Sequence, residues 1–109
     1  MNYLRPMDRI ARIKAFLEQN PKDSFLRHAL ALEYIKLEQL QEAKTLFLAL
    51  LNDDPGYVGS YYHLAKLLET LEERDAAIEW YEKGMETAKK AGDNHALNEL
   101  RAAYEDLIF

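Results

Sequence analysis

The sequence contains no cysteine among its 109 residues, and this absence excludes a disulfide framework, a thiolate metal site and a cysteine nucleophile. Valine occurs once and threonine three times, whereas leucine occurs 18 times and alanine 14 times. β-Branched side chains suit a pleated sheet, but unbranched side chains lose less rotamer freedom in a helix. The composition therefore predicts an all-α fold.

Long apolar segments are also absent. The longest uninterrupted apolar run covers residues 46–51, whereas a helix that spans a membrane needs about 20 apolar residues. The first residues lack the apolar stretch of a signal peptide. We therefore expect a cytoplasmic protein that makes no membrane contact.

The net charge is −5, but basic residues are concentrated near the start of the sequence. Residues 1–22 carry five basic and two acidic side chains, so the rest of the chain has a net charge of −8. An acidic body repels a phosphate backbone, so we expect no nucleic-acid binding. A weaker alternative is contact with RNA or an anionic membrane through Arg5, Arg9, Arg12 and Lys14.

The sequence repeats with a period of 34 residues, which is the distance between Pro21 and Pro55. A shift of 34 superimposes seven apolar positions: Leu30 on Leu64, Ala31 on Ala65, Tyr34 on Leu68, Leu37 on Leu71, Ala43 on Ala77, Phe47 on Tyr81 and Leu51 on Met85. The reverse shift places Ile13 under Phe47 and Leu17 under Leu51. The residues before Pro21 therefore form the second half of a preceding repeat.

Apolar residues within each repeat follow the helical period. This spacing predicts helices over residues 7–19, 24–37, 40–52, 57–70, 73–91 and 94–108. Residues suited to helix ends support these limits: Asp23 or Ser24 caps the second helix, Asp54 with Pro55 precedes the fourth, Gly92 follows the fifth in a left-handed conformation, and Asp93 or Asn94 caps the sixth. The sixth helix carries an apolar stripe that we expect to cover the last repeat, formed by Leu97, Leu100, Tyr104, Leu107 and Ile108.

The two full units share one residue pattern. They read Arg27-x2-Leu30-Ala31-x2-Tyr34, Ala43-x3-Phe47, Pro55 and Tyr61-x2-Leu64-Ala65-x2-Leu68, Ala77-x3-Tyr81. Over about residues 9–91 this pattern resembles the tetratricopeptide repeat, a helical hairpin that reads W-x2-L-G-x2-Y, A-x3-F, P. The departures are Arg27 at the first aromatic position, alanine in place of glycine in both units, and Lys89 in place of the closing proline.

The resemblance implies a helix-hairpin solenoid, an α-α superhelix of about six helices in a single domain over residues 1–109. We assign residues 7–19 to a half repeat, 24–55 and 58–91 to full repeats, and 94–108 to a capping helix. Small residues are expected to let the paired helices of each hairpin approach closely, and these are Ala31 with Ala43 and Ala65 with Ala77.

The resemblance also implies a non-catalytic adaptor or scaffold that binds a peptide or a partner's helix on a concave groove lined by the first helix of each hairpin. Ten residues outside the hairpin seam are expected there: Phe25, His28, Leu32, Ile35, Lys36, Tyr62, His63, Lys66, Glu69 and Thr70. An alternative is that Phe25, Leu32 and Ile35 pack against the half-repeat helix through Ile13, Phe16 and Leu17.

Two of these residues bear on the class of peptide. Family members that bind the acidic C-termini of chaperones use lysine and asparagine side chains, and here Leu32 and His63 stand where asparagine would be expected. A carboxylate clamp of that kind is therefore not expected. Lys36 and Lys66 remain able to meet an acidic peptide, but an exposed ion pair contributes only about 0–1 kcal/mol.

No arrangement of residues predicts catalysis, a metal site or a cofactor. The three histidines, His28, His63 and His95, match no helical ligand pair, and Ser24 and Ser60 lie near helix starts, where capping accounts for them. The acidic residues from Glu69 to Glu82 lack the spacing of a calcium loop and are interpreted as a solvated face. Tyr61, Tyr62, Trp80 and Tyr81 could stack nucleic-acid bases, but base stacking needs a basic groove and this segment is acidic, so we interpret Trp80 and Tyr81 as core and hairpin-edge residues.

A second hypothesis is a self-assembling structural protein that oligomerises through the ends of the solenoid, either the half-repeat face of residues 7–19 or the final helix. The first repeat is incomplete, and apolar solenoid ends without a polar cap tend to associate with copies of themselves.

Overall fold

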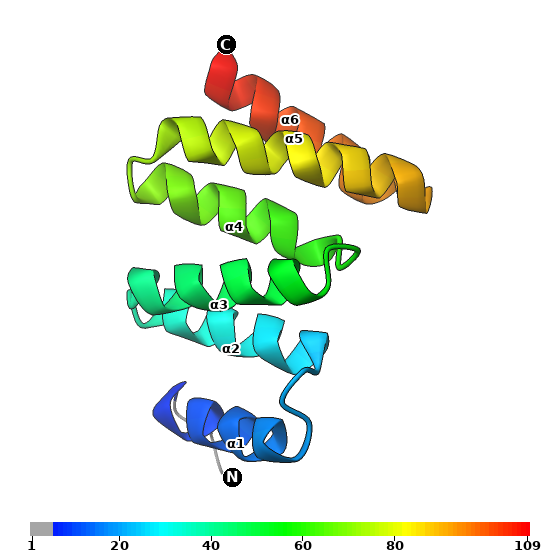
Figure 1. Ribbon diagram of the computed structural model, residues 1–109. Helices are drawn as coiled ribbons and strands as arrows, with labels where there is room; N and C mark the ends of the chain where they lie inside the picture. The colour runs from blue at the N-terminus through cyan, green and yellow to red at the C-terminus, as the bar shows by residue number, and fades with distance from the viewer. Residues whose placement is uncertain (1–5) are drawn as a thin grey trace, which may run out of the picture. The chain divides into compact units, whose positions relative to one another are not determined.

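The computed structural model describes residues 6–109, which form six α-helices and contain no strand (Figure 1). The helices are α1 (Pro6–Gln19), α2 (Ser24–Lys36), α3 (Leu40–Asp53), α4 (Gly59–Thr70), α5 (Arg74–Ala91) and α6 (Asn94–Ile108). The predicted all-α helical-hairpin fold is confirmed, and every helix begins and ends within two residues of its predicted limits. None of the helices in this part of the chain combines the length and apolar character that crossing a bilayer requires.

The chain folds as two compact units, which we call unit 1 (up to Asp53) and unit 2 (Asp54–Phe109). In unit 1, α2 packs against both α1 and α3. In unit 2, α5 packs against both α4 and α6, and α6 also contacts α4. Each unit therefore contains one complete helical hairpin and one additional helix.

Small side chains allow the close packing within the hairpin of unit 1. Ala31 of α2 and Ala43 of α3 are both 0% exposed, in agreement with the expected seam. Phe47 and Leu50 of α3 are fully buried as well. Burying a side chain of this size contributes roughly 1.5–3 kcal/mol, so the seam is a principal source of this unit's stability.

The core of unit 2 repeats this arrangement with one further close contact. Ala65 and Ala77 are fully buried, and the helices also approach closely at Gly84 of α5. A Cβ atom at Gly84 would lie 2.7 Å from Cβ of Tyr61 and 3.1 Å from a δ-carbon of Leu100. Because a real Cβ does not approach another carbon so closely, only glycine lets α4, α5 and α6 pack at this distance.

The α6 helix covers the second hairpin, as its apolar stripe predicted. Leu100 and Ala103 are buried, and the other stripe residues are half-buried. The Asp93 carboxylate caps α6 by accepting a hydrogen bond from the amide of Ala96 at 3.0 Å. Gly92 ends α5 with φ 71°, the left-handed conformation that glycine adopts without steric cost.

The caps of the other helices are partly as predicted. Asp23 caps α2 by accepting from the amide of Leu26 at 2.9 Å. The predicted start of α4 is wrong by two residues, because Tyr57 donates its amide to the Asp54 carbonyl at 3.1 Å and closes a turn first. The expected capping role of Ser60 is also wrong. No side chain caps α4, and Ser60 lies in its first turn with 0% exposure.

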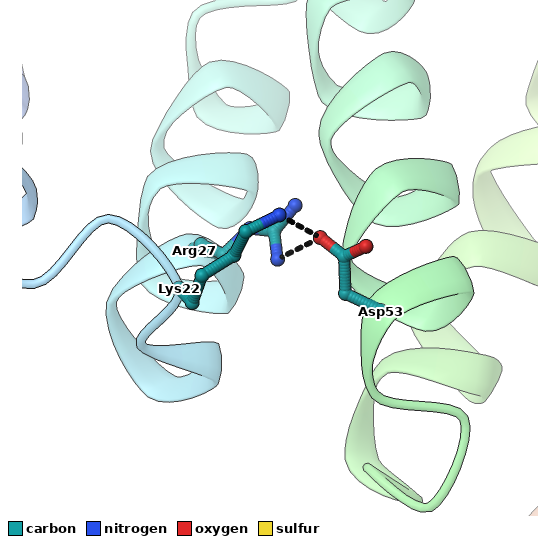
Figure 2. A network of polar contacts seen from close by, with 3 residues as sticks. All are labelled: Lys22, Arg27 and Asp53. Carbon is teal, nitrogen blue, oxygen red and sulfur yellow. Dashed lines mark hydrogen bonds and ion pairs between the residues drawn. The ribbon is translucent and has the colours of Figure 1, made fainter.

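Arg27 stands where the repeat pattern has an aromatic residue, and ion pairing accounts for its burial. Its Nη1 atom lies 2.8 Å from Oδ2 of Asp53 at the end of α3, and Lys22 Nζ lies 2.9 Å from the same oxygen (Figure 2). Hydrogen bonds from Lys22 and Arg27 hold the pKa of the Asp53 carboxyl below its usual range. The ion pair between Arg27 and Asp53 therefore links the start of α2 to the end of α3.

The matching position in unit 2 is Tyr61, which uses a different interaction. Its hydroxyl donates a hydrogen bond to the Pro55 carbonyl at 2.6 Å, and its ring lies 5.8 Å from that of Trp80. The same place in the two hairpins is therefore held by an ion pair in one unit and by an aromatic residue in the other.

Candidate functional site

The first candidate surface is the α2 face, which consists of Phe25, His28, Leu32, Ile35 and Lys36. These residues follow the helical spacing i, i+3, i+7, i+10 and i+11, so the helix itself brings them onto one side. The Phe25 side chain is 69% exposed, and Leu32 and Ile35 are half-buried. Unit 1 therefore carries an apolar surface that its own packing leaves partly open.

The half-repeat helix α1 leaves Phe25 largely uncovered. Phe16 of α1, a predicted packing partner, is itself 54% exposed, and Ile13 and Leu17 are half-buried. Two aromatic rings with most of their area in water do not form a shared core. The packing alternative therefore does not account for Phe25, while the half-burial of Leu32 is compatible with either interpretation.

The two polar members of the α2 face have partners within unit 1. The His28 ring meets the Phe47 ring edge-on at a centroid distance of 5.7 Å. The Lys36 ammonium lies 2.9 Å from Glu33 Oε2, and the Arg9 guanidinium of α1 lies 2.7 Å from Glu33 Oε1. Burial alone would raise the pKa of the Glu33 carboxyl, but the hydrogen bonds from Lys36 and Arg9 outweigh it and lower the pKa.

The second candidate surface is the α4 face of unit 2, which consists of Tyr62, His63, Lys66, Glu69 and Thr70. Glu69 is its centre, because its carboxylate accepts a hydrogen bond from the Tyr81 hydroxyl and lies 3.7 Å from the Lys66 ammonium. Thr70 donates its hydroxyl to the Lys66 carbonyl at 3.2 Å. Burial and the Glu69 carboxylate both raise the pKa of Tyr81, so this phenol remains a hydrogen-bond donor.

His63 differs from its neighbours on the α4 face because it is influenced by α6. Burial lowers the pKa of His63, and the negative charge of Glu99 on α6 partly opposes that effect. The ring also meets the Tyr62 ring edge-on at a centroid distance of 5.6 Å. His63 therefore lies toward the α6 side of this face and is more buried than the exposed Lys66.

Two of the basic N-terminal residues that the structure describes have partners within unit 1. Arg9 is paired with Glu33, and the Lys14 ammonium lies 5.8 Å from the centre of the Tyr34 ring. Arg12 is exposed, whereas Arg5 lies outside the residues that the structure describes. This distribution of partners weakens the alternative of contact with RNA or an anionic membrane.

The sequence did not predict a third feature, an open hollow of about 430 Å³ in unit 1. It is lined by one residue of α1, two of α2 and four of α3: Lys14, Leu30, Tyr34, Gln41, Glu42, Thr45 and Leu46. None of these residues belongs to the α2 face. The sequence alone could not reveal it, because a hollow depends on how three helices meet.

Residues 58–90 match the sequence profile of the tetratricopeptide repeat family. A tetratricopeptide repeat domain protein from Salinibacter ruber, solved in solution by NMR, is 43% identical, with 81% of this chain and 89% of that chain covered and a TM-score of 0.78. The chain belongs to the tetratricopeptide repeat family.

Other tetratricopeptide relatives are more distant or much longer. The human tetratricopeptide repeat protein 21B is 33% identical over 107 residues, which are 97% of this chain but only 7% of the human protein. The TPR2B domain of yeast Sti1, in a complex described as TPR2B-domain:pHsp70, is 17% identical, with 94% of this chain and 82% of that chain covered and a TM-score of 0.86. That likeness concerns the tetratricopeptide fold alone.

Proposed function

We propose that this tetratricopeptide protein is a non-catalytic interaction module that binds a peptide or a partner's helix through its α2 and α4 faces. The observation that carries the proposal is the 69% exposure of Phe25 beside Leu32 and Ile35 on the first helix of a complete hairpin. Exposed aromatic residues beside aliphatic ones are typical of protein-binding surfaces. The tetratricopeptide fold is a protein–protein interaction fold, which supports the same conclusion.

The charges on these faces favour an apolar ligand over a strongly acidic one. Lys36 is already paired with Glu33, and Lys66 with Glu69. An acidic peptide would have to compete with these carboxylates, and an exposed ion pair contributes only about 0–1 kcal/mol. We therefore propose that the partner supplies large apolar side chains at helical spacing, which the exposed Phe25 ring would contact.

The test begins with selection of binding peptides of about 15 residues, displayed as a random library, against the purified chain. Affinity of a selected peptide is then measured by calorimetry for Phe25→Ala, Leu32→Glu and Tyr62→Glu. Each substitution is expected to weaken binding at least tenfold, because each removes or charges an apolar contact. Phe25 is exposed, so its replacement leaves folding intact even if Leu32→Glu does not.

Ala49→Glu is the matched control, since Ala49 is an exposed residue of α3 outside both faces. Its affinity should equal that of the unmodified chain. Peptides that bind with unchanged affinity to all three test variants would show that the α2 and α4 faces are not the binding surface.

A further inference from the structure

One side of α6 carries two carboxylates next to the α4 face. Helix α6 contacts α4 as well as α5. Glu99, Ala102 and Asp106 are exposed and follow the spacing i, i+3 and i+7, so they share one side of α6, which we call the acidic side. Leu97 and Tyr104 of the apolar stripe each lie two residues before one of these carboxylates and therefore point to another side of the helix.

The charges of Glu99 and Asp106 act on groups of the α4 face. Burial lowers the pKa of His63, and the Glu99 charge opposes that effect. Burial and the bound Glu69 carboxylate raise the pKa of Tyr81, and the Asp106 charge adds to them. His63 and Glu69 are six residues apart on α4, and the two carboxylates are seven apart on α6. The acidic side therefore runs along the α4 face, with Glu99 near one end and Asp106 near the other.

These two carboxylates are not neutralised by the α4 face. Lys66 supplies the cation of that face, and it is paired with Glu69 at 3.7 Å. His63 is kept neutral, because burial lowers its pKa. Within residues 6–109, no hydrogen bond or ion pair involves Glu99 or Asp106. The surface formed by the α4 face and the acidic side of α6 thus carries uncompensated negative charge.

Two further cations lie along α6, but they do not cancel this charge. Arg101 is two residues from Glu99 and so lies on another side of the helix, where its Nη1 atom is 3.5 Å from Asn98 Oδ1. Arg74 donates to the Leu107 carbonyl at 3.4 Å, in the last turn of α6. Unit 2 as a whole has 12 acidic and six basic side chains, a net charge of −6, whereas residues 1–53 have a net charge of +1.

The spacing of the carboxylates matches that of a helical ligand. Seven residues span about 10.5 Å along an α-helix, so a partner helix that lies along α6 presents side chains at i and i+7 at the same separation. Ala102 lies between Glu99 and Asp106, and its small side chain lets a partner helix approach. The half-buried Tyr62 of the α4 face offers an aromatic contact beside these charges.

We propose that the partner helix carries two lysine or arginine residues seven positions apart, which pair with Glu99 and Asp106 while apolar side chains contact Tyr62. This inference rests on the proposed function, because it assigns the chemistry of the partner that the α4 face binds. Glu99 and Asp106 are then specificity residues that select a basic partner over a neutral or acidic one. The negative charge of unit 2 also accelerates the encounter with such a partner.

The first experiment compares the peptides that two forms of the chain select. A display library of random peptides of about 15 residues is selected against the unmodified chain and, separately, against a charge-reversed variant that combines Glu99→Lys and Asp106→Lys. We expect the unmodified chain to enrich lysine and arginine at positions seven apart. The charge-reversed variant should instead enrich glutamate and aspartate at that spacing.

The second experiment measures the affinity of one peptide from the first selection by calorimetry. Glu99→Gln combined with Asp106→Asn should weaken binding about three- to tenfold, because two exposed ion pairs are lost. Affinity for the unmodified chain should fall as salt rises from about 0.05 M to about 0.5 M, and affinity for this double variant should fall less. Both residues are exposed, so the circular dichroism spectrum should not change.

Glu79→Gln combined with Glu86→Gln is the matched control. These exposed carboxylates of α5 are also seven residues apart, and they pair with Lys83 and Lys90 of the same helix. The control changes the net charge by the same amount, but outside the α4 face and the acidic side of α6. Its affinity should differ from that of the unmodified chain by less than about twofold.

The outcomes separate this inference from the proposed function. A peptide that loses affinity with Tyr62→Glu but keeps it with Glu99→Gln and Asp106→Asn overturns the inference and leaves the proposed function standing. Equal losses in the test and control variants also overturn it, as does a basic pattern that persists in the selection against the charge-reversed variant. If Tyr62→Glu leaves affinity unchanged, or if no peptide is selected, binding through the α4 face is contradicted and the inference fails with it.

Discussion

Glu38 and Glu72 occupy the same left-handed backbone conformation in the two hairpin turns, with φ 59° and 62°. They are 34 residues apart, so the same strained backbone conformation recurs at the period of the sequence repeat. Each follows the first helix of its hairpin, where its amide donates to a carbonyl three residues earlier, at 2.9 Å for Glu38 and 3.0 Å for Glu72. The turn therefore requires a conformation that glutamate adopts at a cost.

Replacing either glutamate by glycine should stabilise the chain. A left-handed L-residue costs about 1–2 kcal/mol, and glycine avoids that cost while losing more entropy on folding. We expect Glu38→Gly and Glu72→Gly each to raise the free energy of unfolding by about 0.5–1 kcal/mol. Urea unfolding followed by circular dichroism measures the change.

Glu42→Gly is the control for this prediction, because Glu42 is an exposed residue in the first turns of α3. Glycine inside a helix costs about 1 kcal/mol relative to alanine, so this variant should be less stable. Equal effects of glycine at Glu38 and Glu42 would contradict the assignment of strain to the turn.

Gly84→Ala should destabilise the chain. The added Cβ would lie 2.7 Å from Cβ of Tyr61, so α4 and α5 must move apart. Overpacking of this kind costs about 1–3 kcal/mol. The expected result is a lower denaturant midpoint with an unchanged slope.

Gly59→Ala is the matched control, since nothing beyond its chain neighbours and the backbone of its own helix lies within 4 Å of the Cβ position at Gly59. Alanine there should be neutral or stabilising by up to about 1 kcal/mol, because it reduces the entropy of the unfolded chain. The close-packing account of Gly84 fails if the two alanine variants have the same stability.

Asp53 should make the stability of the chain depend on acid pH. Lys22 and Arg27 lower the pKa of this carboxyl in the folded chain, so the stabilisation is present above the unfolded pKa and is lost as pH falls through the folded pKa. Asp53→Asn should therefore reduce stability at neutral pH and flatten its decline toward acid. Thermal unfolding between about pH 3 and pH 7 measures both effects.

Glu18→Gln serves as the comparison because Glu18 is an exposed carboxylate of α1 outside this network. Its stability profile should follow that of the unmodified chain. If Asp53→Asn also leaves the profile unchanged, the contacts in Figure 2 do not contribute to stability.

His63 should produce a second pH dependence in a different range. Burial lowers its pKa in the folded chain below the usual value of 6.5, so the unfolded chain takes up the proton first as pH falls. Stability is therefore full above about pH 6.5 and declines below it until the folded form is protonated as well. His63→Gln should remove this part of the decline in thermal unfolding.

His95→Gln is the control, because His95 is an exposed histidine at the start of α6 in the same unit. The decline in stability below about pH 6.5 should persist in this variant. If the decline disappears in His95→Gln and persists in His63→Gln, the assignment of the effect to His63 is contradicted.

The fold was predictable because local and repeated signals agree. The 34-residue period, the helical spacing and the paired alanines at Ala31 and Ala43 all predict a helical hairpin, and the structure contains it. The left-handed turns at Glu38 and Glu72 were not predicted, since glycine or asparagine is the usual sign of that conformation. The requirement for Gly84 was also missed, because it arises from helices that meet only in the folded chain.

The positions of the candidate surfaces could be predicted from the sequence, but the ion-pair partners of the charged residues could not. Helical spacing places Phe25 and Leu32 on one side of α2 without any tertiary information. The pairing of Arg9 with Glu33 joins residues 24 positions apart, and that of Arg27 with Asp53 joins residues 26 apart. Such contacts depend on helix packing, so the sequence could not show which charged groups are already neutralised.

The most direct test of the proposed binding surface is an NMR titration of the isotope-labelled chain with a display-selected peptide. We expect the largest amide shifts within residues 25–36 of α2 and 62–70 of α4, with little change at Gln41 to Leu46 around the hollow. Shifts concentrated around the hollow, or absent from α2 while the peptide binds, would contradict the account.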